Sequence, residues 1–180
     1  MNNIEDIEWN KIYLVPERKR GYRVAYNMNK LKFITPEVYL PFGIEIYNDK
    51  EILNLLITND NNEKYNFKNF IETMEKIYEQ FSLGQSTIKL PYVNLPPDFI
   101  RDIKNKEFVK TIKSGPCGHT LRTHLKNVEI YKFINEKKEM IEKKNAVKKK
   151  CKCEIEFSNI WIYGDKYGIV WNISKIELLD

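Results

Sequence analysis

Hydrophobic and polar residues alternate along much of the first third of the chain. In the stretch GYRVAYNMN, which starts at Gly21, every second residue is apolar and Arg23 falls on the opposite side. The side chains expected on one face are Tyr22, Val24, Tyr26 and Met28. This period of two is typical of a β-strand that buries one face. EILNLLIT, from Glu51, predicts another strand, which ends at the turn-forming residues NDNN.

A period of three and four residues replaces the alternation in the middle of the chain. It predicts one amphipathic helix over about residues 66–81, with Asn66 capping its N-terminus. The apolar stripe of this helix consists of Phe67, Phe70, Ile71, Met74, Ile77, Tyr78 and Phe81. We assign the stripe to the core, because a buried helix needs one continuous apolar face. The Pro-punctuated residues 82–107 are predicted to be irregular, with at most one short helical turn.

Further extended stretches indicate that most of the chain is β-structure. Two prolines in TPEVYLPFGIEIY predict an edge or a corner, because proline lacks a backbone donor. FVKTIKS, HTLRTHLK and VEIYKFI predict three separate strands. A closing hairpin, KCKCEIEFSNIWIYG and YGIVWNISKIELL, is joined at Gly164-Asp165.

These elements predict a mainly β fold with a single domain over residues 1–180. We expect an oligonucleotide-binding (OB)-like Greek-key β-barrel with one inserted amphipathic helix (about residues 66–81) and a Lys-rich excursion (about 136–150). A chain of 180 residues with 42% hydrophobic and 31% charged residues is long enough to bury one substantial core.

Composition also limits the environment of the protein. The sequence has no apolar run of about 18 residues, so we expect no membrane span. The acidic start MNNIEDIEWNK does not resemble a signal peptide, so we do not expect secretion. Three cysteines, an odd number with two of them in KCKC, argue against a disulfide framework.

Positive charge is concentrated in one segment. The protein carries a net charge of +5, and Lys137 to Lys152 alone holds eight lysines and two glutamates, a net charge of +6. The segment fits either a solvated loop or a flexible phosphate-binding arm. The lysines that we assign to such an arm are Lys143, Lys144, Lys148, Lys149 and Lys150.

Motifs for catalysis are lacking in the sequence. SGPCGHT has no lysine that could reach a phosphate, and Cys117 and His119 have no visible third group to orient them. We therefore expect no enzyme and no cofactor. Cys117, His119, Cys151 and Cys153 could together form a structural zinc site. The competing interpretation is that Cys151 and Cys153 point into the core from one strand.

Two strands carry candidate binding residues for nucleic acid. In HTLRTHLK, Arg122, His124 and Lys126 alternate with residues that are expected to face the core. The core-facing residues of this strand are Leu121, Thr123 and Leu125. A row of cationic groups about 6 to 7 Å apart suits a polyanion, although a solvated strand face would look the same.

The closing hairpin contains more aromatic surface than a small barrel can bury. The pattern around Trp171 predicts a core face, whereas Trp161 and Tyr163 follow a predicted bulge at Ser158-Asn159. We therefore assign Trp171 to the core, and Trp161 with Tyr163 to a platform on which bases stack.

Two motifs carry a resemblance to a known family. FITPEVYLPFGIEIYND and IWIYGDKYGIVWNISKIEL resemble segments of the OB-fold single-stranded DNA-binding proteins of nucleocytoplasmic large DNA viruses, which are distantly similar to phage replication proteins of the same activity. The resemblance implies a non-enzymatic protein that coats single strands without sequence preference during viral DNA replication or repair. By position, it makes Pro41, Phe42 and Gly43 a structural corner. It makes Tyr167, Gly168 and Trp171 part of the closing hairpin.

The expected partner is single-stranded DNA, and binding of RNA and self-association stay open. The resemblance implies action in the host cytoplasm, at a viral replication site, or in the nucleus. Two alternatives remain. A duplex-binding virion nucleoprotein would rely on the Lys-rich segment, and a zinc-stabilised interaction module in a transcription or assembly complex would carry metal.

Overall fold

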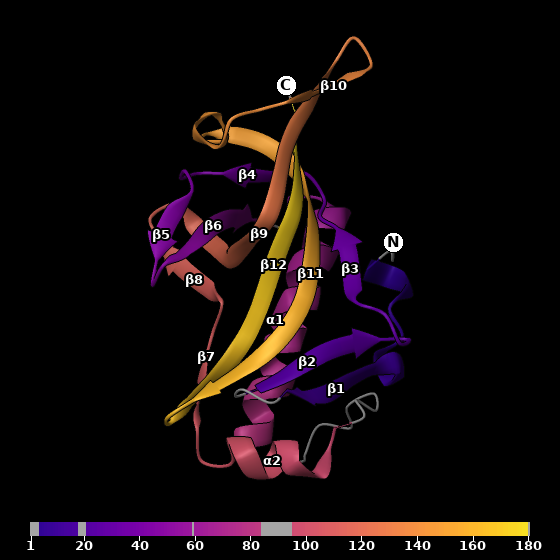
Figure 1. The fold of residues 1–180 in the computed structure, drawn as a ribbon, viewed down its shortest axis with the longest axis vertical. Helices are drawn as coiled ribbons and strands as arrows, with labels where there is room; N and C mark the ends of the chain where they lie inside the picture. The colour runs from indigo at the N-terminus through magenta and orange to yellow at the C-terminus, as the bar shows by residue number, and fades with distance from the viewer. Residues whose placement is uncertain (1–3, 18–20, 59, 84–94, 180) are drawn as a thin grey trace.

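The computed structural model describes residues 4–17, 21–58, 60–83 and 95–179. Within these ranges the chain forms two α-helices, three short 3-10 helices and twelve strands, as Figure 1 shows. The helices are η1 (Ile4–Asp6), η2 (Trp9–Lys11), α1 (Asn62–Ser82), α2 (Pro97–Ile103) and η3 (Lys143–Asn145). The strands are β1 (Ile12–Glu17), β2 (Gly21–Tyr26), β3 (Leu31–Ile34), β4 (Val38–Leu40), β5 (Glu45–Tyr47), β6 (Lys50–Ile57), β7 (Glu107–Val109), β8 (Ile112–Gly115), β9 (Gly118–Ile134), β10 (Lys137–Met140), β11 (Lys149–Tyr163) and β12 (Lys166–Leu178).

Strand pairing closes five strands into a ring. β11 pairs with β4, β4 with β6, β6 with β9, β9 with β12, and β12 with β11. The β9–β12 pairing is parallel and the other four are antiparallel. Tyr39 and Leu56 form the single register pair between β4 and β6, so the wall is incomplete there. The fold is thus mainly β and OB-like, as predicted, although the ring is not a regular barrel.

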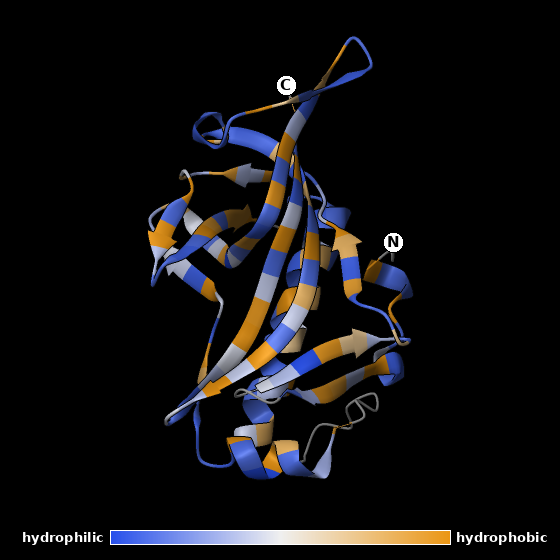
Figure 2. Cartoon of the chain, viewed as in Figure 1, coloured by the Kyte–Doolittle hydropathy of each residue, from blue (hydrophilic) through white to orange (hydrophobic). Residues whose placement is uncertain are grey.

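The closing hairpin forms the longest part of the ring. β11 and β12 meet at Gly164-Asp165, and a register shift between Phe157 and Asn159 confirms the predicted bulge at Ser158. Figure 2 shows hydrophobic and hydrophilic residues alternating along both strands. Trp171 is fully buried, as predicted, with its ring centroid 4.9 Å from that of Phe157.

Helix α1 packs its apolar stripe against the core of the ring. Six of the seven predicted stripe residues are buried, and Phe81 packs against them partly exposed. The prediction that Asn66 caps the helix was wrong. Asn61 is the N-cap, and its side chain accepts a hydrogen bond from the backbone N–H of Lys64. Asn61 of NDNN therefore starts the helix, whereas Asn59 lies outside the described residues.

Several predicted boundaries in the second half need correction. Residues 84–94 of the predicted irregular connection lie outside the described residues, but the rest of it holds the seven-residue α2, which is longer than one turn. FVKTIKS is divided between β7 and β8, because the buried carboxylate of Glu75 accepts hydrogen bonds from the backbone N–H groups of Thr111 and Ile112. HTLRTHLK and VEIYKFI belong to one strand, β9, in which Asn127 has a φ of 49°.

One residue at the end of the first alternating stretch also differs from its prediction. Met28 lies in the turn after β2 with a φ of 65° and is 89% exposed, so it does not continue the buried face of that strand. Asn29 bonds back to Tyr26 and thereby ends the strand at that residue.

The Lys-rich excursion is an ordered part of the fold. β10 pairs with the end of β9, and residues 141–148, which we call the strap, then lead into β11. Ala146 in the strap is 1% exposed, and the backbone N–H of Lys148 donates to the carbonyl of Leu40. The strap is therefore anchored to the ring and is not a free arm. No described helix has the length and apolar character needed to cross a membrane.

Candidate nucleic-acid interface

Cross-strand register places one set of residues on the side of β5, β6, β8 and β9 that points away from the core. We call this side the outer face. Arg122 lies opposite Asn54, and His124 lies opposite Ile52. Directly paired residues of an antiparallel sheet point to the same side. The residues that share this side are Glu45, Tyr47, Lys50, Ile52, Asn54, Leu56, Lys113, Thr120, Arg122 and His124. Leu121 and Thr123 are buried on the opposite side, as predicted.

Arg122 lies over an aromatic ring on the outer face. Its guanidinium carbon is 5.3 Å from the centroid of the Tyr47 ring, which is a cation–π contact. The Tyr47 side chain is 54% exposed. The Nε atom of Arg122 is buried and has no hydrogen-bond partner among the described residues. The guanidinium is thus held by stacking, with donor capacity left over.

His124 occupies the next outward position on β9. Its Nδ1 atom is buried, and the described part of the chain offers it no hydrogen-bond partner. Burial lowers the pKa of His124 below its usual 6.5, and the positive charges of Lys50 and Arg122 lower it further. The imidazole is therefore neutral at neutral pH in the free protein.

The outer face is cationic and largely uncompensated. Among the described residues, no carboxylate lies within ion-pair distance of the four cationic side chains on or beside this face. These side chains are Lys50, Lys113, Arg122 and the exposed Lys126. Glu45, an acidic residue of this face, accepts a hydrogen bond from the Asn54 amide. A polyanion would therefore meet positive charge here.

The lysines predicted to form a phosphate-binding arm lie in a different environment. Lys143 binds Glu51, Lys144 binds Glu142 and Lys150 binds Glu37, at 2.6, 2.5 and 2.9 Å. Lys148 and Lys149 have no ion pair within the described ranges. The net charge of +6, which already counts Glu142, is thus partly neutralised by Glu37 and Glu51 from the first third of the chain.

The predicted stacking platform lies at the tip of the closing hairpin. Tyr163 is 67% exposed, whereas Trp161 is half-buried. The indole of Trp161 lies against Gly168. A Cβ added to Gly168 would lie 3.0 Å from two atoms of that indole. Figure 1 shows this tip in the lower half of the molecule and the orange strap in its upper half. The candidate residues therefore form three separate groups: the outer face, the hairpin tip, and the strap with the first two residues of β11.

The four candidate zinc ligands are not brought together. Cys117 is exposed in the turn between β8 and β9, whereas Cys151 and Cys153 are buried in β11 with their sulfur atoms 3.6 Å apart. His119 Nδ1 lies 3.2 Å from the hydroxyl of Ser114. Among the described residues, no group of three or more His, Cys, Asp or Glu side chains could hold a metal ion. Strand alternation explains this outcome, because it turns both β11 thiols into the core.

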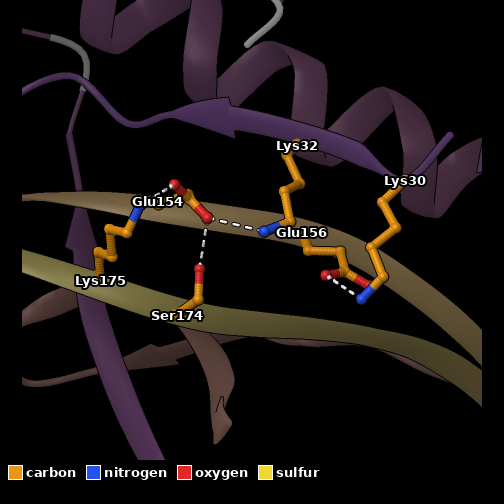
Figure 3. Close-up of polar contacts among 6 residues, drawn as sticks. All are labelled: Lys30, Lys32, Glu154, Glu156, Ser174 and Lys175. Atoms are coloured by element: carbon orange, nitrogen blue, oxygen red, sulfur yellow. Dashed lines mark hydrogen bonds and ion pairs between the residues drawn. The ribbon is translucent and has the colours of Figure 1, made fainter. Parts of the chain in front are cut away.

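A buried acidic cluster stabilises the wall of the ring beside the outer face. Glu154 and Glu156 on β11 are 5% and 9% exposed, and Figure 3 shows lysines reaching both carboxylates. Lys32 and Lys175 bind Glu154 at 2.8 and 3.2 Å, and Lys30 binds Glu156 at 3.2 Å. Because each carboxylate is paired, this cluster is well explained as part of the fold.

Sequence reasoning missed the three residues that add an aromatic ring or further positive charge to the outer face. Tyr47 and Lys50 face each other across a two-residue turn, Asn48-Asp49, in which both residues have positive φ. Asn and Asp at such positions are typical of a tight hairpin, so YNDK could have placed this pair. Lys113 lies opposite Thr120 in a register that the sequence alone does not define.

Comparisons with known proteins yield structural neighbours only. No protein-family model and no curated protein matches the sequence. The fold is similar to a single-stranded DNA-binding protein from bacteriophage Enc34. For the structure of the phage protein in complex with ssDNA, the TM-score is 0.47 and the sequence identity is 13%. The match covers 94% of this chain and 96% of the phage chain. For the same protein without DNA the TM-score is 0.43, with 16% identity over 93% and 89% of the two chains.

A C-terminal truncation of the phage protein gives a TM-score of 0.46, with 13% identity over 93% of this chain and 94% of that one. Scores and identities of this size leave function to be decided by the chain's own residues.

Proposed function

We propose that this protein binds single-stranded DNA without sequence preference. The observation that carries the proposal is the uncompensated cationic outer face, where Arg122 lies over Tyr47 and Lys50 and Lys113 flank them in register. β6 and β9 follow β4 in the ring as its second and third strands, and OB folds bind oligonucleotides on the corresponding face. Cations bind phosphates irrespective of sequence, and an aromatic ring stacks on any base.

A role in viral DNA replication or repair, in the host cytoplasm or nucleus, is part of the same proposal and rests on the sequence resemblance. A single strand is favoured over a duplex because the outer face offers an aromatic ring among its cations. A stacked duplex has no free base faces for such a ring to contact.

The experiment is a titration of the purified protein with labelled oligo(dT), poly(rU) and duplex DNA at several salt concentrations. The test variant carries Arg122→Gln and Lys113→Gln. Each lost phosphate contact lowers the slope of log affinity against log salt by about 0.7, so we expect a decrease of about 1.4 for oligo(dT).

The control variant carries Lys143→Gln and Lys144→Gln, which removes the same number of charges from lysines that are already in ion pairs. We expect a smaller change in its slope. If duplex binds more tightly than oligo(dT), or if only the control variant loses its salt dependence, the outer face is not the single-strand site. Urea midpoints of both variants verify that they are folded.

A further inference from the structure

The outer face contains one local arrangement that general affinity for a polyanion does not explain. An aromatic ring from β5 lies under a guanidinium from β9, and an imidazole occupies the next outward position of β9. Arg122 lies over one face of the exposed Tyr47 ring, while His124 is in register with Ile52 of β6. Ile52 is only 2% exposed, so the neighbouring side chains cover this part of the sheet.

We infer that Tyr47, Arg122 and His124 form a subsite for one nucleotide, which takes up a proton on binding. The base stacks on the Tyr47 ring, and Arg122 and the protonated His124 bind the adjacent phosphate. This inference rests on the proposed single-strand binding and adds a defined ligand position and a pH dependence to it.

The surroundings of His124 favour protonation only when an anion is present. On β6 it lies opposite Ile52, and the positive charges of Lys50 on that strand and of Arg122 on β9 act on it. On β12 it lies opposite the neutral Asn172. A phosphate among these cations would offset their repulsion of an imidazolium and accept a hydrogen bond from it.

Acidic and phenolic groups near this position do not supply that anion. Glu45 on β5 is bonded to Asn54, and Glu156 on β11, beyond Asn172, is paired with Lys30. Tyr47 carries a phenol and no carboxylate, and its ring lies beneath Arg122. The buried Nδ1 atom of His124 has no partner among the described residues, so the ring is not fixed in one protonation state by a hydrogen bond at that atom.

Thermodynamic linkage makes the proton and the strand stabilise each other. His124 has one pKa in the free protein and a higher one in the bound protein if binding takes up a proton. Affinity for oligo(dT) then rises as pH falls through the range between these two values. The steepest expected change is about tenfold per pH unit.

The direct test is an NMR titration of the two histidines of the wild-type protein, with and without oligo(dT). The chain contains only His119 and His124, so two ring resonances report on both sites, and His119→Gln assigns them. We expect the pKa of His124 to rise on binding and that of His119 to stay unchanged. An unchanged His124 pKa in the bound protein overturns the inference without any need for a variant at that position.

Matched variants test the two side chains separately. His124→Gln should abolish the pH dependence of oligo(dT) affinity, whereas His119→Gln should leave it as in the wild type. Tyr47→Ala should weaken binding about five- to 150-fold, because a stacking ring contributes on that scale for each base. Tyr65→Ala is its control, because Tyr65 on α1 is also 54% exposed but lies outside the outer face. Tyr47→Phe keeps the ring and should bind like the wild type.

The outcomes separate this inference from the proposed function. Absence of oligo(dT) binding at every pH would refute single-strand binding itself. Binding whose affinity does not depend on pH, or wild-type affinity of a folded Tyr47→Ala, would refute the subsite alone.

Discussion

Glu154→Gln tests whether the buried acidic cluster stabilises the ring. The carboxylate of Glu154 accepts hydrogen bonds from Lys32 at 2.8 Å, Ser174 at 2.6 Å and Lys175 at 3.2 Å. Burial by itself raises the pKa of this group, but the three donors outweigh it and lower the pKa to about 2 from an ordinary value of 4.5. The ionised form is therefore stabilised in the folded protein.

The magnitude follows from the size of this change in pKa. One pKa unit corresponds to about 1.36 kcal/mol, so a decrease of about 2.5 units gives an upper bound of about 3 kcal/mol for the contribution of ionised Glu154 to the free energy of unfolding. Because the folded-state pKa is depressed, this stability is present above the unfolded value of 4.5. It is lost as pH falls from there towards 2.

The assay is urea unfolding of wild type and Glu154→Gln across this pH range. At neutral pH we expect the variant to be less stable by up to about 3 kcal/mol, because its amide leaves two lysines without their carboxylate. Near pH 2 the two proteins should approach equal stability. The control is Glu142→Gln, whose ion pair with Lys144 is exposed and should have a much smaller effect on stability.

Parallel pH curves for wild type and Glu154→Gln would refute this reasoning. They would mean that Glu154 has the same pKa in the folded and unfolded states, and hence that Lys32 and Lys175 do not hold its charge. Equal stability at neutral pH would refute it as well.

Two further predictions concern the core and the thiols. Trp171→Ala should cost about 3 to 5 kcal/mol of stability, measured by urea unfolding, because the indole is fully buried. Trp161→Ala should cost less, and a loss of oligo(dT) affinity in that variant would place the hairpin tip on the DNA path. A thiol-reactive dye should label the folded wild type at Cys117 alone, since the other two thiols are buried, and Cys117→Ser should stay unlabelled until it is unfolded. Rapid labelling of all three thiols in the folded protein would contradict the burial of Cys151 and Cys153.

Local periodicity predicted the parts of the fold that short-range geometry determines. The stripe of α1 follows from side-chain spacing on a helix, and the burial of Trp171 follows from strand alternation. The bulge at Ser158 was visible because it interrupts that alternation. The continuity of β9 was not predicted, because Asn127 interrupts the pattern that indicates a strand. In the structure the strand continues through Asn127, which has a positive φ.

Contacts between distant segments explain why the candidate site was only partly predicted. Tyr47 reaches Arg122 through the register of β5, β6 and β9, which depends on pairing between segments far apart in the chain. The pairing of Lys143 with Glu51 spans 92 residues. The net charge of a short segment does not include partners from distant parts of the chain. The sequence therefore overestimated how much positive charge the Lys-rich segment offers to DNA.

The difference between the two cationic regions has a thermodynamic consequence for binding. An exposed ion pair contributes at most about 1 kcal/mol, so a phosphate can displace Glu51 from Lys143, but the displaced carboxylate then opposes part of the gain. At the outer face Arg122 and Lys113 have no carboxylate to release within the described ranges, so a phosphate contact there keeps its full value. A strand that meets both regions should therefore occupy the outer face first and reach the strap only at low salt, where weaker contacts persist.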